Sequence, residues 1–295
     1  MKFQNGKNRG MKYSRIYLLA CLISLVNLCG AQESSLLWKV SENGLAKPSY
    51  LFGTIHMICQ DQIRLSEKVE RAFAKCEQLT LELDLDEADF MSRMQQQSLN
   101  PNMVNISGKM NEREKSLVNA YFQEHYGTDL SQLGILKPFV LISMMYAKAI
   151  ECDTAGSIES TLLKKARSKG WEIHGLEKIE DQISLFDSVS VEEQLSWMVK
   201  YIEDEQHFKA LMRQITKAYL KEDLNQIARM NDEFPEYADM EEVMLGERNR
   251  KWIDTIVKQA EKKPTFFAVG AAHLGSKSGL IKLLKQEGYQ VEAVF

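Results

Sequence analysis

Short apolar runs of β type stand at both ends of the chain, outside its first thirty residues, and a long stretch of helical pattern separates them. "LLWKV" (36–40) and "SYLFGT" (49–54) flank an Asn-Gly pair, which is typical of hairpin turns. "TFFAVG" (265–270) and "QVEAVF" (290–295) flank a helical pattern, and strand-helix-strand units usually build parallel sheet. The chain ends therefore predict an α/β fold with a mixed central sheet and a large helical insertion.

Two further strands are expected between these ends. In "QLTLELDLD" (78–86), leucines alternate with polar residues, which predicts a strand with one buried face. "WEIHGLE" (171–177) has a similar pattern, whereas 65–76, most of 87–165 and 190–260 are helical in pattern. We find no linker rich in Pro, Gly or Ser, so residues 32–295 are expected to form a single domain.

The first 31 residues are typical of a secretory signal peptide. Basic residues precede the apolar run 16–28, and a small-residue cleavage pattern follows it, with Met11 as an alternative start. An uncleaved membrane anchor is disfavoured because the run is short, and a lipoprotein modified at Cys21 or Cys29 is a third alternative. These features predict an exported protein, periplasmic or secreted. Three cysteines would remain after cleavage, for which buried thiols are expected over one bridge with a spare thiol.

The composition argues against nucleic acid as a partner. The chain carries 37 Lys and Arg against 41 Asp and Glu, and its net charge is −4. Nucleic-acid binding needs a clustered positive surface, which such a scattered balance does not predict. We expect a peptide or small-molecule substrate and contact with a membrane only through the leader.

Two Gly-x-x-His motifs follow strand-like runs near opposite ends of the chain. They are Gly53 to His56 and Gly270 to His273, in a chain with only five histidines. Glycine permits a sharp turn or a close approach of the backbone to a ligand. Ligands of open α/β sheets bind at the carboxyl ends of strands, so both imidazoles are expected to converge there.

Acidic side chains could complete a metal site. Glu82 and Asp84 share one side of their predicted strand, and with both histidines they would form a His, His, carboxylate set that leaves a position for water. A solvated edge strand is the alternative for this stretch. Arg248, late in a helix, could hold a carboxylate or an anionic transition state, although the helix alone favours an exposed arginine. Glu177, just after a strand, is a candidate proton carrier or a helix cap.

The motifs together resemble the TraB/GumN family, which includes TIKI-type metalloproteases and is distantly similar to erythromycin esterase and ChaN-like proteins. The matching pieces, in the family's order, are "LFGTIHM", "LELDL", "IHGLEKIEDQ", "GERNRKW" and "FFAVGAAHLGSKSGLIKLLKQEGYQVE". The resemblance implies an α/β fold with a helical insertion. It also implies metal or catalytic roles for His56, Glu82 and His273, with Arg248 beside them. At Glu159 the family usually has aspartate, and we expect no role there.

Three functions remain open from the sequence. The first is a hydrolase, a peptidase by resemblance, in which a divalent ion (manganese, cobalt or zinc) activates water. Asp84 or Glu177 would then move the proton and Arg248 would face the oxyanion. The second is a protein that captures a peptide, haem or metal without turnover. The third is a metal-free esterase that uses the histidines as general bases.

Overall fold

Six strands form one mixed sheet in the order β6-β4-β7-β2-β1-β8. The computed structural model describes residues 34–295 apart from 232, 234–239 and 277, and the expected leader lies outside this range. A separate two-stranded ribbon pairs β3 with β5. The strands are β1 (Leu37–Ser41), β2 (Ser49–Thr54), β3 (Ile58–Cys59), β4 (Gln78–Leu83), β5 (Ala155–Gly156), β6 (Glu172–Glu177), β7 (Thr265–Gly270) and β8 (Gln290–Ala293).

The four strands β6, β4, β7 and β2 are parallel, and the hairpin strand β1 pairs antiparallel with β2 and with β8. The expected hairpin is present, with Leu37 opposite Phe52. The last strand β8 runs in the same direction as β7, as a strand-helix-strand connection predicts, but β2 and β1 lie between the two. The mixed α/β sheet is thus confirmed, with strands from both chain ends.

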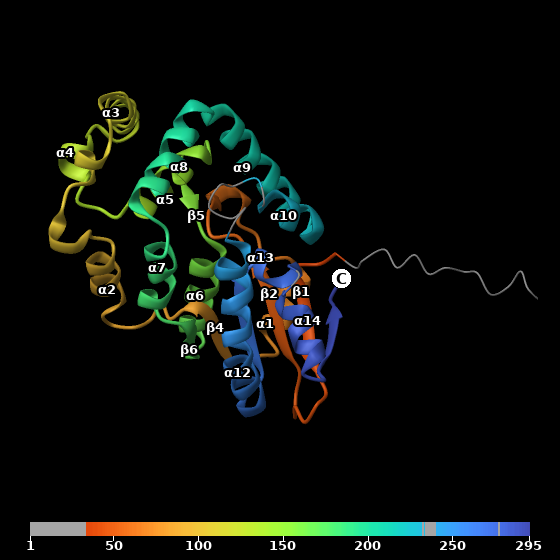
Figure 1. Ribbon diagram of the computed structural model, residues 1–295. Helices are drawn as coiled ribbons and strands as arrows, with labels where there is room; N and C mark the ends of the chain where they lie inside the picture. The colour runs from red at the N-terminus through yellow and green to blue at the C-terminus, as the bar shows by residue number, and fades with distance from the viewer. Residues whose placement is uncertain (1–33, 232, 234–239, 277) are drawn as a thin grey trace, which may run out of the picture. The chain divides into compact units, whose positions relative to one another are not determined.

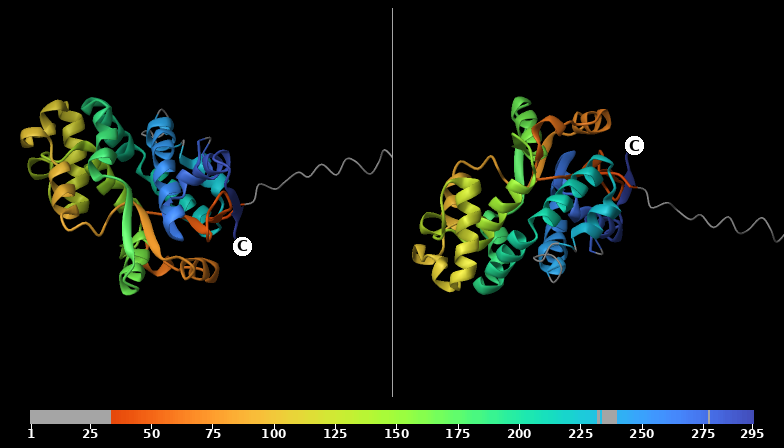
Figure 2. Two further views of the ribbon diagram at one scale, coloured as in Figure 1. Left: turned by 90° about the horizontal axis from the view of Figure 1, so that it is seen from below. Right: turned by 90° about the horizontal axis from the view of Figure 1, so that it is seen from above.

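Helices cover both faces of the sheet (Figures 1 and 2). On one face, Phe73 of α1 (Glu67–Phe73) packs against Phe266 of β7 at a centroid distance of 5.2 Å, and α6 (Ile158–Ser168) contacts β4 and β6. On the other face, α12 (Glu247–Lys262) lies over β4, where Thr80 donates a hydrogen bond to Gln259 at 2.5 Å. The acidic strand is therefore an interior strand with two covered faces, and the expectation of one buried face was wrong.

The insertion supplies helices that gather at one end of the sheet (Figure 1). The helices of the chain's middle are α2 (Phe90–Gln97), α3 (Glu112–Tyr126), α4 (Leu130–Leu133), α5 (Pro138–Ala149), α7 (Ile179–Asp187), α8 (Val191–Glu203), α9 (Glu205–Leu220) and α10 (Leu224–Asn231). A π-helical turn, η4 (Glu242–Gly246), leads into α12, and α13 (Ala272–Gly275) and α14 (Leu280–Gln286) follow β7. Short 3-10 turns occupy Gln60–Gln62, Pro101–Met103 and Ile106–Lys109. Among the described residues, no helix is both long and apolar enough to span a bilayer.

Candidate active site

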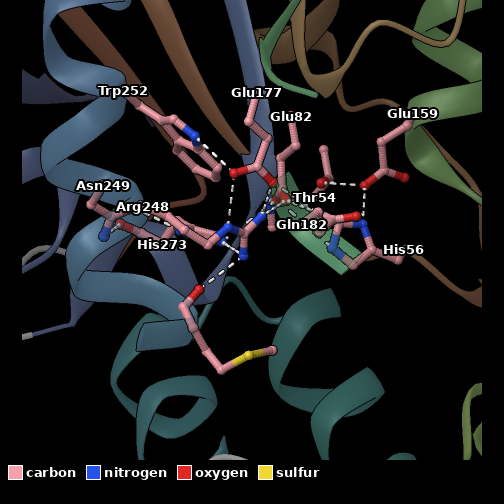
Figure 3. A network of polar contacts seen from close by, with 12 residues as sticks. Thr54, His56, Glu82, Glu159, Glu177, Gln182, Arg248, Asn249, Trp252 and His273 are labelled. Atoms are coloured by element: carbon pink, nitrogen blue, oxygen red, sulfur yellow. Dashed lines mark hydrogen bonds and ion pairs between the residues drawn. The ribbon is translucent and has the colours of Figure 1, made fainter. Parts of the chain in front are cut away.

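The carboxyl ends of the four parallel strands carry the expected site residues. His56 follows β2, Glu82 lies near the end of β4, Glu177 ends β6, and His273 follows β7. The strands are adjacent and parallel, so these ends meet at a single edge of the sheet. Segments far apart in the sequence are thus assembled at one place, as Figure 3 shows.

Both imidazoles approach the same carboxylate oxygen. Nε2 of His56 and Nε2 of His273 each lie 3.8 Å from Oε1 of Glu82. That oxygen also accepts a 2.7 Å hydrogen bond from the backbone N–H of Gly270. The convergence predicted from the two Gly-x-x-His motifs is therefore present, with Glu82 between the rings.

Each imidazole is oriented by a partner on its other nitrogen. Nδ1 of His273 lies 2.6 Å from Oδ1 of Asn249, whose Nδ2 donates to backbone carbonyls of His273 and Ser278. The amide oxygen must then accept from Nδ1–H, which leaves Nε2 of His273 unprotonated in the neutral ring. Nδ1 of His56 lies 2.7 Å from Oε1 of Glu159, and that oxygen also accepts from Thr54 at 2.6 Å.

The role of Glu159 was missed by the sequence analysis, which expected none. The available signal was the acidic residue at this position, where the resembled family usually has aspartate. In the structure, Glu159 lies in the first turn of α6 and its side chain is largely buried, with 11% of its area exposed. Its Oε2 atom is buried and has no hydrogen-bond partner among the described residues. The longer glutamate thus reaches the ring of His56 from another element.

Arg248 connects two buried glutamates beneath the histidines. Its Nη2 lies 2.7 Å from Oε2 of Glu82 and 2.6 Å from Oε1 of Glu177, while Nε lies 3.1 Å from the other Glu177 oxygen. Nη1 donates to the Met244 carbonyl at 2.8 Å and lies 3.2 Å from Nε2 of His273. The residue is 6% exposed. A buried guanidinium needs such partners. The helical pattern favoured an exposed arginine, and this expectation was wrong.

Burial and the neighbouring charges give the two histidines very different pKa values. Desolvation lowers the pKa of His56, but Glu159 and Glu82 outweigh it and raise this pKa to about 9. For His273, burial dominates and lowers the pKa to about 3, although Glu82 opposes this. Burial alone would raise the pKa of Glu82, but the neighbouring histidines and Arg248 hold it far below its usual range. At neutral pH the site therefore holds a charged imidazole, a neutral one and a carboxylate.

The glycines of the two Gly-x-x-His motifs let neighbouring atoms pack close to the backbone, and neither glycine forms a sharp turn. Neither Gly53 nor Gly270 belongs to the described residues with positive φ. A Cβ at Gly53 would lie 2.8 Å from the side chain of Leu274, so this glycine lets α13 pack against β2. A Cβ at Gly270 would lie 3.2 Å from both Oε1 of Glu82 and Nε2 of His56. Gly270 therefore keeps open the space between two potential ligands.

A cavity of about 380 Å³ lies over this strand edge. Its floor contains His56, Glu82, Arg248 and His273. Its walls are apolar and come from the helical insertion and η4. The apolar wall residues are Phe139, Ile183, Phe186, Ile215, Ile227, Met244 and Leu245. A charged floor beneath apolar walls is typical of small-molecule and substrate sites.

Two expected site residues lie apart from this cavity. β4 ends at Leu83, and Asp84 accepts a 2.9 Å hydrogen bond from the N–H of Asp86 in the following turn. Glu177 is bound by Arg248 and also accepts from Trp252 Nε1 at 3.2 Å and from Gln182 at 3.1 Å. Neither acid is among the described residues that line the cavity.

The donor chemistry of the site fits a divalent ion. Two imidazole Nε2 atoms and one carboxylate oxygen face a space that Gly270 keeps open, and the Nδ1 partners match the outer-shell contacts that orient metal-bound histidines. These three residues do not form a complete metal site in the structure. In the described part of the chain, no group of three or more His, Cys, Asp and Glu residues could hold a metal as placed.

Comparisons with known proteins agree with this architecture. The TraB/PrgY/gumN family matches residues 36–293. The chain is also 21% identical over 314 aligned positions to the metalloprotease TIKI2 of Danio rerio, covering 88% of this chain and 61% of that protein. The chain thus spans less than two thirds of the length of this relative. No solved structure matches the chain significantly. Because the family match extends over nearly all of the described residues, the chain belongs to the TraB/PrgY/gumN family.

Proposed function

We propose that the protein is a metal-dependent hydrolase that cleaves peptides. The observation that carries the proposal is the approach of two oriented imidazole Nε2 atoms to one oxygen of Glu82 on the cavity floor. Such a set of two histidines and one carboxylate leaves coordination positions for water and substrate. The similarity to a protein named as a metalloprotease supports the same activity.

His56, Glu82 and His273 would hold the ion. A bound divalent ion lowers the pKa of water and polarises a carbonyl group. Glu159 and Asn249 orient the two rings so that each Nε2 atom faces the shared space. The charged ring of His56 must give up its Nε2 proton when that nitrogen binds an ion. The hydrogen bond from Arg248 to Nε2 of His273 must give way when that nitrogen binds an ion.

Arg248 is placed to stabilise negative charge on the substrate. It lines the cavity, and all five of its N–H groups have partners in the structure. The Nη1–H directed at His273 is released when that nitrogen binds an ion, and it can then face an oxyanion that develops on a carbonyl carbon. Glu177 and Glu82 fix the guanidinium from behind. We assign no proton transfer to Glu177 or Asp84, because neither lines the cavity.

The cavity walls favour substrates with a large apolar side chain next to the reacting bond. Phe139 of α5 and Phe186 of α7 stack with a centroid distance of 4.9 Å and an interplanar angle of 9°. Both line the cavity and are partly exposed to it, so they form an apolar surface above the charged floor. Burying an apolar side chain there would contribute to binding through the hydrophobic effect.

Export completes the proposal. The charged and apolar pattern of residues 1–31 supports a signal peptide, which would direct the hydrolase to the periplasm or out of the cell. The substrate would then be an exported or extracellular peptide. Mass spectrometry of the protein from its producing cell would test this, since cleavage near Ala31 removes the leader.

A metal-free esterase that uses a histidine as general base is the weaker candidate. Arg248 occupies the unprotonated Nε2 of His273, and the low pKa of this ring keeps it neutral. Both features make Nε2 of His273 a poor general base, because an efficient base has a pKa near the working pH and a free nitrogen. Activity that survives exhaustive chelation would select this function over the proposed one.

The proposed function is tested with purified protein, a fluorogenic peptide library and esters. The chelated protein should be inactive, and adding manganese, cobalt or zinc should restore peptide cleavage. His273→Gln should abolish the restored activity, whereas His207→Gln, a control whose side chain is 48% exposed, should retain it. Binding of peptides or metal without any cleavage would instead indicate a capture protein.

A further inference from the structure

The ribbon of β3 and β5 joins two segments that each supply one residue to the site. β3 begins two residues after His56, and β5 ends three residues before Glu159. The ribbon is antiparallel, with Cys59 opposite Ala155. Its strands lie close, since the Gln60 N–H donates to the Thr154 carbonyl at 2.9 Å.

This pairing brings two cysteines together. Cys152 stands three residues before the partner position of Cys59, and the residue after Cys59, Gln60, donates from its N–H to the Thr154 carbonyl. The Cys152 sulfur also lies 3.6 Å from the Thr154 carbonyl oxygen. Both cysteines are partly exposed, so a reagent in solution can reach them. The Cys152 sulfur and the Cys59 segment thus meet at one carbonyl group, and thiols held close on a paired ribbon can become bonded through a small backbone movement.

The third described cysteine has a different environment. Cys76 is 4% exposed, and its thiol donates to the Ala72 carbonyl at 3.5 Å within the α1 region. It therefore serves as an internal control for a buried, unreactive thiol.

We propose that Cys59 and Cys152 form a disulfide that ties the His56 segment to the Glu159 segment. A thiolate of one cysteine attacks a disulfide oxidant such as oxidised glutathione, which forms a mixed disulfide and releases one thiol. The second thiolate then attacks the protein sulfur of the mixed disulfide and displaces the second thiol of the oxidant. One S–S bond forms in the protein, one breaks in the oxidant, and the oxidant leaves as two thiols that carry the two protons. The protein loses two electrons and the oxidant gains them.

The bridge would act on the arrangement of the site. It would close a short path from His56 through both cysteines to Glu159, whose carboxylate orients that imidazole at 2.7 Å. It would also enclose the helices α1 to α5, which lie between the two cysteines in the chain. The bridge thus restricts separation of the two halves of the ribbon.

Thiol counting and peptide mapping test the proposal without any activity assay. The full chain is equilibrated with oxidised glutathione, unfolded without reductant, alkylated and weighed. We expect two alkylatable thiols fewer than in the reduced protein. After tryptic digestion, we expect peptide 40–64 linked to peptide 149–164, and peptide 76–93 alkylated at Cys76.

Two variants sharpen the result. Cys76→Ser should still lose two thiols on oxidation. Cys152→Ser should lose at most one, as a mixed disulfide between Cys59 and glutathione, and should form no bridge within the chain. Full alkylation of wild-type Cys59 and Cys152 after oxidation would overturn the proposal. A bridge to Cys76, or a disulfide between two copies of the chain, would also overturn it.

Discussion

Nδ1 of His56 lies 2.7 Å from Oε1 of Glu159, although 102 residues separate them in the chain. The contact fixes which ring nitrogen faces Glu82, because the second nitrogen is then the one left toward the cavity. Asn249 holds His273 in the same way from α12. The site therefore depends on residues outside the pair of motifs that first identify it.

Replacing Glu159 should weaken metal binding without unfolding the protein. In Glu159→Gln the charge that orients His56 is lost, and loss of such outer-shell partners lowers metal affinity by about 10- to 100-fold. Titration with zinc or cobalt, followed by calorimetry, measures the change. Glu67→Gln, at a side chain that is 92% exposed, is the matched control and should bind as wild type does. Equal affinities for all three proteins would contradict the assigned role.

Replacing Arg248 should strongly reduce stability. Arg248→Met leaves the buried carboxylates of Glu82 and Glu177 without their shared partner, which costs about 3–5 kcal/mol of unfolding free energy. Urea unfolding measures this loss. Arg250→Met, on the same helix with its side chain 46% exposed, should change the free energy by less than about 0.5 kcal/mol. A similar small change in both variants would show that the buried network contributes little.

Truncation of the apolar wall should change substrate preference. Phe139→Ala removes one ring of the stacked pair, so kcat/KM for peptides with a large apolar side chain should fall about 10-fold or more. Peptides with alanine at that position should be cleaved nearly as before. Phe295→Ala, at a side chain that is 72% exposed, is the control. A uniform loss for all peptides would indicate a structural role for the wall.

The buried thiol of Cys76 should make stability depend on pH in the alkaline range. Burial raises the pKa of Cys76 from 9.0 to about 12, so above pH 9 the unfolded chain ionises this thiol while the folded protein keeps it protonated. The unfolding free energy that Cys76 contributes is complete below pH 9 and falls by up to about 1.4 kcal/mol per pH unit above it. Subtracting the urea unfolding curve of Cys76→Ala from that of wild type isolates this slope. Parallel curves between pH 8 and 10.5 would contradict it.

Much of the site is predictable from the sequence because strand ends and Gly-x-x-His motifs can be recognised in short segments. Parallel strands order their carboxyl ends at one edge, which is why His56 and His273 could be paired from the sequence. The acidic residue at 159 was a signal, but its contact with His56 could not be predicted from a local pattern. The ribbon of β3 and β5 that joins their segments is two residues long on each side and carries no recognisable periodicity. Asp84 shares the alternation of Glu82, but β4 ends at Leu83 and the pattern does not reveal where the strand stops.

Anomalous scattering from crystals soaked in cobalt or zinc tests the central claim most directly. A single strong peak is expected between Nε2 of His56 and Nε2 of His273, next to Oε1 of Glu82, and this peak should be lost in Glu82→Gln. Crystals that show no peak there while the soaked protein cleaves peptides would contradict the assignment of the metal to this site.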